Sequence, residues 1–182
     1  YLSEAVKSTA KRIRTLEIQG ARNVAIAAIK AMETLARETE AKNKKAFLSE
    51  LSQAKEILFA SRATEPLMRN AIRCITSQVE KSEDRSIRKL AEIVSGASNQ
   101  FLKNLEASKE KIADIGAKRI RNKSVILTHC HSSTVTYLLK KAKERGKSFE
   151  IICTETRPVF QGRTTAKEML DAGVKPELIV DS

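Results

Sequence analysis

The residues best suited to chemistry in this sequence are a cysteine and two histidines that follow a short apolar run. Val125 to Leu127 are apolar, and the next residues read Thr-His-Cys-His-Ser-Ser. An apolar strand that ends in a polar, helix-starting turn is how α/β proteins present reactive side chains at the carboxyl edge of a sheet. Cys130 lies between two imidazoles near a predicted helix start, which favours the thiolate at neutral pH. Cys130 is therefore the leading catalytic candidate, with a small buried hydrophobe as the alternative interpretation.

A second predicted strand, over residues 149–154, ends in residue types that bind anions. It is followed by Thr-Arg-Pro-Val-Phe-Gln-Gly-Arg over 156–163, and two earlier turns, 19–22 and 61–64, each combine a helix start with an arginine. Backbone N–H groups at a helix start and a nearby guanidinium bind phosphate well. Each turn alone is equally typical of simple helix capping. The hypothesis of a phosphate site therefore depends on the three turns meeting at one crevice.

Metal binding is the rival use of the segment 129–131. On an extended backbone its two histidines point one way and the thiol points the other, and no second ligand pair follows in the sequence. We therefore expect neither a metal nor another cofactor. Cys74, in a helical segment, and Cys153, in a strand, are expected to lie in the core.

The apolar pattern changes its period near residue 120. Helices are expected over 3–18, from 24 onward, over 46–59, over 67–79 and over 87–115, the last with an interruption near Gly96. Strands are then expected over 125–128, 149–154 and 178–180, with helices over 134–145 and 165–172, and a βαβαβ order predicts a parallel sheet. The predicted fold class is α plus α/β: a helical domain over 1–120, and over 121–182 the first part of a Rossmann-like domain. A three-stranded parallel sheet with a bare edge is a poor place for a domain to stop, so we expect the chain to be part of a longer protein.

Composition favours an anionic partner but not a dedicated nucleic-acid binder. The formal net charge is +12, which attracts polyanions, yet aromatic residues make up only 4% and tryptophan is absent. The basic residues also alternate with acidic ones along the helices. No apolar run approaches the ~18 residues of a membrane span. Three irregularly spaced cysteines favour a reducing compartment, so a cytoplasmic location is expected.

Five motifs taken together resemble one protein family. They read Glu-Ile-Gln-Gly-Ala over 17–21, Ser-Arg-Ala-Thr over 61–64, Gly-Ala-Lys-Arg-Ile over 116–120, Thr-His-Cys-His-Ser over 128–132 and Thr-Glu-Thr-Arg-Pro over 154–158. The sequence resembles the family that joins the regulatory subunits of translation initiation factor 2B to the aldose-1-phosphate isomerases. Within it, the archaeal ribose-1,5-bisphosphate isomerase branch is the most similar.

This resemblance implies a sugar phosphate bound between a helical and a Rossmann-like domain. In the isomerase branch an aldose 1-phosphate becomes a ketose phosphate, and Cys130 would be the catalytic cysteine, with its aspartate partner beyond Ser182. The resemblance further implies a homo-oligomer and, for the regulatory branch, an initiation factor 2 subunit as partner. The substrate- or phosphate-binding residues would be Gly20, Ala21, Arg22, Arg62, His131, Ser132, Arg157, Gln161 and Gly162.

Three positions depart from the pattern of the family's enzymes. Gln19 stands where arginine usually precedes Gly-Ala, Ala63 replaces a proline, and Glu65 adds a negative charge next to a predicted anion site. These departures favour the alternative of a non-catalytic regulatory subunit that binds a nucleotide or a sugar phosphate. The sequence leaves both alternatives open.

Overall fold

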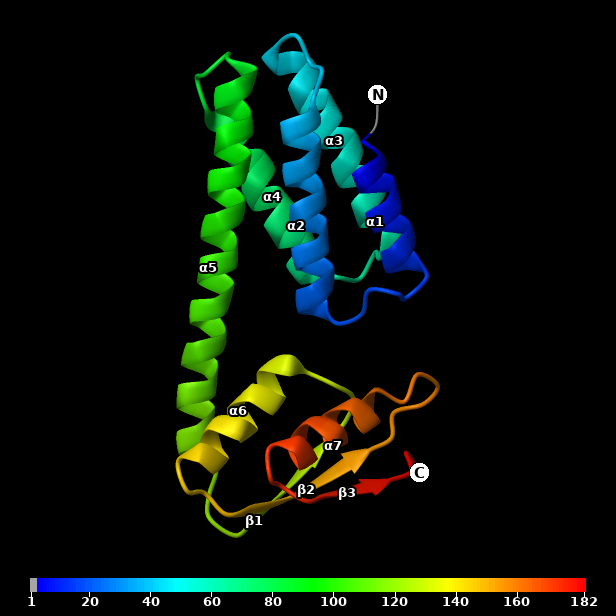
Figure 1. The fold of residues 1–182 in the computed structure, drawn as a ribbon, viewed down its shortest axis with the longest axis vertical. Helices are drawn as coiled ribbons and strands as arrows, with labels where there is room; N and C mark the ends of the chain where they lie inside the picture. Colours follow the sequence, from blue (N-terminus) through cyan, green and yellow to red (C-terminus); the bar gives the residue numbers. More distant parts are fainter. Residues whose placement is uncertain (1–2) are drawn as a thin grey trace. The chain divides into compact units, whose positions relative to one another are not determined.

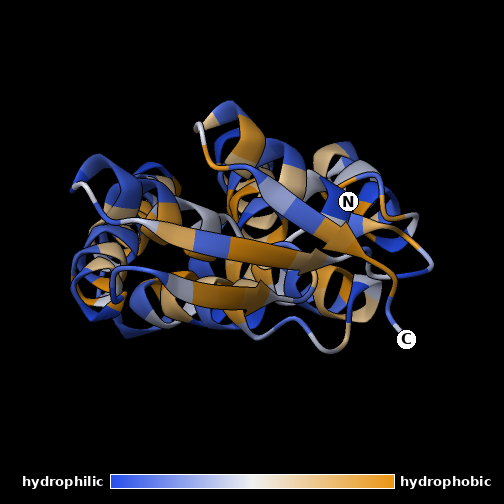
Figure 2. Ribbon diagram, turned by 90° about the horizontal axis from the view of Figure 1, so that it is seen from below, coloured by the Kyte–Doolittle hydropathy of each residue, from blue (hydrophilic) through white to orange (hydrophobic). Residues whose placement is uncertain are grey.

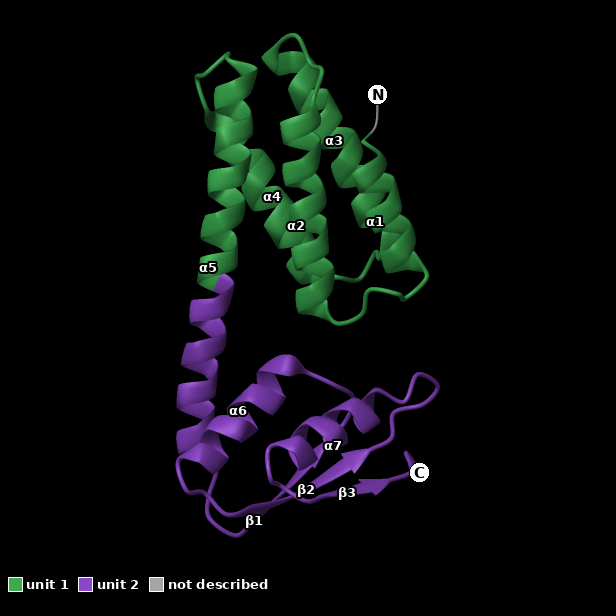
Figure 3. Ribbon diagram, viewed as in Figure 1, with its two compact units in different colours: residues 1–104 green, residues 105–182 purple. Residues whose placement is uncertain are grey.

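A computed structural model describes residues 3–182, which form seven helices and three strands (Figure 1). The chain forms two compact units, and the boundary between them lies between Asn104 and Leu105, inside the long helix α5 (Figure 3). The elements are, in order, α1 (Glu4–Arg14), α2 (Ala21–Glu38), α3 (Lys44–Ser61), α4 (Pro66–Lys81), α5 (Ile87–Arg119), β1 (Ser124–Thr128), α6 (Ser133–Glu144), β2 (Phe149–Thr154), α7 (Gln161–Asp171) and β3 (Pro176–Ile179).

The first unit is a helical bundle of α1 to α4 and the first part of α5. Each helix buries one apolar stripe, and Ala25 and Ala28 of α2 are fully buried, so that neighbouring helices can approach α2 closely. The predicted interruption at Gly96 is wrong, since α5 is one continuous helix. A glycine inside a helix costs only ~1 kcal/mol, which the buried stripe of α5 outweighs. Cys74 is exposed on the outer face of α4, so its predicted place in the core is also wrong.

The second unit contains a parallel sheet in the order β1-β2-β3, which confirms the predicted βαβαβ topology. Leu139 of α6 and Met169 of α7 pack with Ile151 and Cys153 of β2, so that both helices contribute to one small core, and Cys153 is buried as predicted. Val125 and Leu127 of β1 are more than half exposed. Figure 2 shows the apolar strands of the sheet from the side that these two helices do not cover.

The last turns of α5 belong to the sheet unit because they contact α6. Gly116 lets the helices approach closely: a Cβ there would lie 2.0 Å from Cδ1 of Leu138. Beside this contact, the ammonium of Lys141 lies 2.6 Å from Glu110 and 2.9 Å from Asp114. Within residues 3–182, no helix is both long and apolar enough to cross a membrane.

Candidate functional site

The carboxyl ends of the three strands lie at one edge of the sheet because the strands are parallel and adjacent. Thr128 is in register with Cys153, and Thr154 with Ile179, so the three chains leave the sheet side by side. The turn after β1 carries Cys130, the turn after β2 carries Arg157, the first turn of α7 carries Arg163, and the segment after β3 carries an aspartate. These side chains form the candidate site of the sheet unit.

Cys130 is half-buried and is held in place by three hydrogen bonds. Its backbone N–H donates to Oγ1 of Thr156 at 2.8 Å, and its thiol donates to the amide oxygen of Gln161 at 2.9 Å. Its carbonyl oxygen accepts from the hydroxyl of Thr165 at 2.9 Å. The backbone φ of Cys130 is +69°, a left-handed conformation that is rare for a residue with a side chain. The backbone over 129–131 is therefore not extended, because the chain bends at the cysteine itself.

The two histidines that flank the cysteine are held by different threonines. Nδ1 of His129 lies 2.7 Å from the hydroxyl of Thr154, and Nδ1 of His131 lies 3.1 Å from that of Thr165. Nε2 of His131 also lies 3.7 Å from Glu168 on α7. Across residues 3–182, no group of three or more His, Cys, Asp or Glu side chains is arranged to hold a metal ion. The histidines thus connect the turn to β2 and to α7.

Two guanidinium groups, one from the turn after β2 and one from the first turn of α7, share one buried carboxylate. Glu155 is only 6% exposed, and it accepts from Nε of Arg157 at 2.5 Å and from Nη2 of Arg163 at 3.3 Å. The carboxylate raises the pKa of Arg157 above its ordinary value. The guanidinium of Arg163 also lies 4.1 Å from the ring centre of Phe160. Both arginine side chains remain more than half exposed, so they can offer donors to an anion while the glutamate fixes their position.

Asp181, two residues after the end of β3, is a residue of the candidate site that the sequence interpretation missed. Its Oδ1 accepts from the backbone N–H of Thr156 at 2.8 Å, and its Oδ2 accepts from that of Arg157 at 2.7 Å. These two backbone donors, first Arg157 and then Thr156, lower the pKa of the carboxyl. The sequence held a signal for this role, because an aspartate that ends a third parallel strand must reach the same sheet edge as Cys130.

Two predicted binding residues have visible structural roles. Ser132 is the N-cap of α6, and its hydroxyl accepts from the backbone N–H of Val135 at 3.5 Å. Gly162 lies in the first turn of α7, which starts at Gln161 and thus earlier than the predicted residue 165. A Cβ at Gly162 would lie 1.7 Å from the carbonyl oxygen of Thr154, so that only glycine allows α7 to approach β2 this closely.

The remaining predicted residues lie in the helical unit. Gly20 is the N-cap of α2 with a φ of +81°, and it is followed by Ala21 and the half-buried Arg22. Nε of Arg62 lies 3.8 Å from the carboxylate of Glu65, which is almost completely buried. The α1–α2 and α3–α4 connections lie at the same end of the bundle in Figure 1. That these residues share one site with Cys130 stays a prediction.

Comparison with known proteins places the chain in a family. Residues 17–182 match the model of the initiation factor 2 subunit family. The chain belongs to this family. The ribose 1,5-bisphosphate isomerase of Thermococcus kodakarensis is 37% identical to it over 179 residues, which are 97% of this chain and 56% of that protein. The putative translation initiation factor eIF-2B subunit 2-like protein of Pyrococcus furiosus is 42% identical over 91 residues, 50% of this chain and 33% of that protein.

A solved structure extends the similarity to the fold. The translation initiation factor eIF-2B of Pyrococcus horikoshii OT3 superposes with a TM-score of 0.85 and 29% identity, covering 99% of this chain and 61% of that one. The chain spans about half the length of the archaeal isomerase that it matches. The resemblance read from the five motifs is thereby confirmed at the level of the family.

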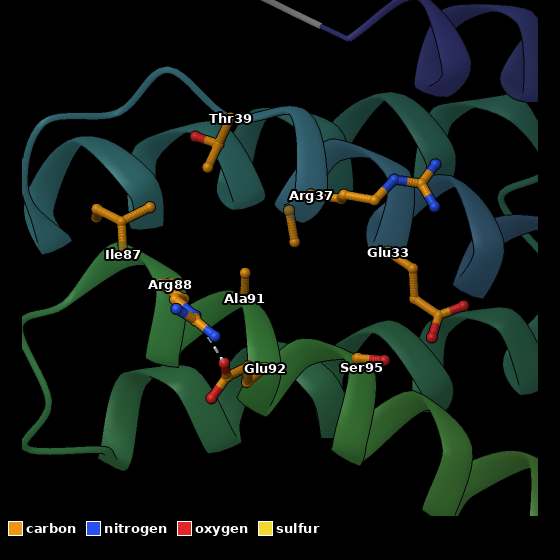
Figure 4. A pocket seen from close by; sticks show the side chains of 9 residues that line it. Glu33, Arg37, Thr39, Ile87, Arg88, Ala91, Glu92 and Ser95 are labelled. Atoms are coloured by element: carbon orange, nitrogen blue, oxygen red, sulfur yellow. Dashed lines mark hydrogen bonds and ion pairs between the residues drawn. The ribbon is translucent and has the colours of Figure 1, made fainter.

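The helical unit of this family member also contains a concave region that the sequence interpretation did not predict. A cavity of about 610 Å³ lies between the end of α2 and the start of α5 (Figure 4). Ala36, Ala91 and Ile87 contribute its apolar lining, and Arg88 at its edge lies 3.2 Å from Glu92. Arg37, Arg88 and Glu92 at this cavity are exposed and Glu33 is half-buried, and the cavity belongs to a different unit from Cys130.

Proposed function

We propose that the protein containing this chain is a sugar-phosphate isomerase that converts an aldose 1-phosphate, ribose 1,5-bisphosphate, into the corresponding ketose phosphate. The observation that carries the proposal is the thiol of Cys130, which is held half-buried at the sheet edge and donates to Gln161. Arg157 of the turn after β2 and Arg163 of α7 are held on one buried carboxylate, Glu155, which suits a phosphate group. The similarity to the archaeal ribose 1,5-bisphosphate isomerase supports this choice of substrate.

The reaction needs proton transfer but no co-reactant. The ring C–O bond at C1 breaks, the hydrogen on C2 moves to C1, and the C2 hydroxyl becomes a carbonyl. The proton of that hydroxyl ends on the former ring oxygen, so that all atoms and electrons balance. In this proposal the Cys130 thiol transfers a proton to or from the sugar, and the arginines bind its phosphate. We further propose that the full-length protein is a homo-oligomer, which light scattering would measure directly.

Two variants of the full-length protein, each with one cysteine replaced by alanine, test this proposal. Turnover of ribose 1,5-bisphosphate would be followed by ³¹P NMR in the parent, in Cys130→Ala and in Cys74→Ala, because Cys74 is an exposed cysteine of the helical unit. Loss of a proton-transfer group should slow turnover by about 10²-fold or more in Cys130→Ala. Cys74→Ala should keep the parental rate. Equal rates for Cys130→Ala and the parent would refute the catalytic role.

A regulatory subunit that binds a nucleotide or sugar phosphate without converting it is the second candidate. It is favoured by Glu65, whose buried carboxylate lies 3.8 Å from Arg62 and opposes an added anion there. Calorimetric titration of full-length protein with ribose 1,5-bisphosphate and with a nucleoside monophosphate separates the two candidates. Binding without turnover supports the regulatory function, and the absence of any binding removes it.

A further inference from the structure

The carboxylate of Asp181 makes an unusually complete contact with a neighbouring turn. Each of its two oxygens accepts one backbone N–H, from Thr156 at 2.8 Å and from Arg157 at 2.7 Å. Hydrogen bonds to an ionised acceptor are about twice as strong as neutral ones, and two parallel bonds also fix orientation. Asp181, which lies after the end of β3, therefore holds the turn that follows the neighbouring strand β2.

The turn needs such support because its first held residue is in an unfavourable conformation. Thr156 has a φ of +59°, although it is β-branched. A β-branched residue at positive φ is a genuine outlier, and such a conformation, which costs ~1–3 kcal/mol, persists only where the surroundings impose it. The bonds from Asp181 act on the N–H of Thr156 itself and on that of the next residue, so they bear directly on this backbone.

Thr156 in turn contacts the candidate catalytic residue. Its hydroxyl accepts the backbone N–H of Cys130 at 2.8 Å, and Cys130 is itself at a φ of +69°. Two left-handed residues from neighbouring turns are thus joined by one hydrogen bond. An unbroken series of hydrogen bonds runs from Asp181 through Thr156 to Cys130.

We propose that Asp181 is a positioning residue that fixes the Thr156–Arg157 turn and, through the Thr156 hydroxyl, the backbone conformation that aims the Cys130 thiol. The effect on catalysis rests on the proposed isomerase function, whereas the effect on conformation does not. Asp181 acts through other residues and is not itself assigned contact with substrate.

A charge-matched control separates positioning from a general effect of charge. Asp181→Asn removes one negative charge and replaces one accepting oxygen by an N–H₂ group, which cannot accept from the turn. Asp181→Ala removes both acceptors. Glu177→Gln removes one negative charge from β3 itself, at an exposed position two strand residues before its end.

Conformation would be measured first, on the full-length protein with Cys74→Ser as background so that the exposed cysteine does not react. Hydrogen exchange with mass spectrometry would follow peptides covering residues 155–158 and 129–132, and iodoacetamide would report the alkylation rate of Cys130. We expect Asp181→Ala to speed exchange in both peptides by about tenfold or more and to change the alkylation rate severalfold. Asp181→Asn should act in the same direction, and Glu177→Gln should match the background protein.

Catalysis would be measured on the same set. Misplacement of a catalytic group lowers kcat, so kcat should fall by about 10-fold or more in Asp181→Ala while KM changes less and the melting temperature stays near the parental value. If Asp181→Ala lowers the melting temperature strongly, the isosteric Asp181→Asn decides. Parental exchange and alkylation rates in Asp181→Asn and Asp181→Ala, or equal changes in Glu177→Gln, would overturn the proposal.

The two proposals fail in different ways. Full activity in Cys130→Ala would remove the isomerase mechanism, but exchange and alkylation would still decide whether Asp181 positions the cysteine. An inactive Cys130→Ala protein together with parental behaviour in Asp181→Ala would instead leave the isomerase function standing and remove the role of Asp181.

Discussion

Substitution of Gly162 by alanine tests how tightly the site is assembled. The new methyl carbon would lie 1.7 Å from the carbonyl oxygen of Thr154 and 2.8 Å from its carbonyl carbon. An ordinary carbon–oxygen contact is ~3.3 Å, so the first turn of α7 or the end of β2 must move by about 1.6 Å. The new Cβ is bonded directly to the backbone of α7, and the atoms that it meets are backbone atoms of β2. Neither can rotate away as the end of a long side chain can. Overpacking costs ~1–3 kcal/mol, and we expect Gly162→Ala near the upper end of this range.

Two other glycines provide graded comparisons. A Cβ at Gly116 would lie 2.0 Å from Cδ1 of Leu138, the far end of a side chain that can turn aside, so Gly116→Ala should cost less. A Cβ at Gly96 would meet nothing within 4 Å. Because alanine is the better helix former, Gly96→Ala should stabilise α5 by up to ~1 kcal/mol.

Scanning calorimetry of the full-length variants measures this series. A loss of 1 kcal/mol in the free energy of unfolding lowers the melting temperature by roughly 2–4 °C. Gly162→Ala should therefore lower it by about 6–12 °C, and Gly96→Ala should raise it slightly. Because Gln161 precedes Gly162, the same variant should also change the alkylation rate of Cys130, whose thiol bonds to that amide. A melting temperature for Gly162→Ala equal to that of the parent would refute the argument that α7 must approach β2 this closely.

Two further predictions concern the sheet unit. Hydrogen bonds to Lys141 hold the pKa values of Glu110 and Asp114 below their ordinary 4.5 and 3.8. These ionised carboxylates therefore stabilise the fold at a pH above the ordinary pKa values. The stabilisation is lost as the pH falls through the lowered pKa values. Lys141→Met should therefore lower the urea midpoint at pH 7, and this difference should shrink below pH ~4; a difference that is constant with pH would contradict the assignment. Leu127 is 66% exposed on β1, so in a polypeptide of residues 1–182 Leu127→Lys should reduce binding of the dye ANS. Leu170→Lys, at a 59% exposed leucine of α7, is the control, and an equal reduction there would argue against a special role of the sheet face.

Much of the fold could be predicted from the period of the apolar residues. The strand over 149–154 has the predicted bounds, because its β-branched and aromatic residues lie between a glycine-containing turn and a polar loop. The start of α7 could not be predicted as well. It begins at Gln161 after Phe160, an αL residue, and is seated on the carbonyl of Thr154. A contact between residues from two elements leaves no periodic signal in either of them.

The candidate site was predicted in part for a related reason. Cys130 and Arg157 stand at strand ends, and parallel strands bring their carboxyl ends together, so that sequence order alone placed them at one edge. Asp181 was missed because its role consists of two bonds to backbone N–H groups, which every residue but proline possesses. No residue type in the turn marks such a partner, and the one signal in the sequence was the place of Asp181 after a third parallel strand.

Five sequence motifs by themselves determined the family, and the order of apolar and polar residues determined the division into helical and α/β parts and the place of the cysteine after a strand. Tertiary structure alone decided the left-handed backbone at Cys130 and Thr156, the shared carboxylate of Glu155, and the reach of Asp181 across the sheet edge. The physical reason is the distance along the sequence between the residues that interact. Periodicity and capping act between residues a few positions apart, whereas these conformations are stabilised by hydrogen bonds between residues that only the folded sheet brings together.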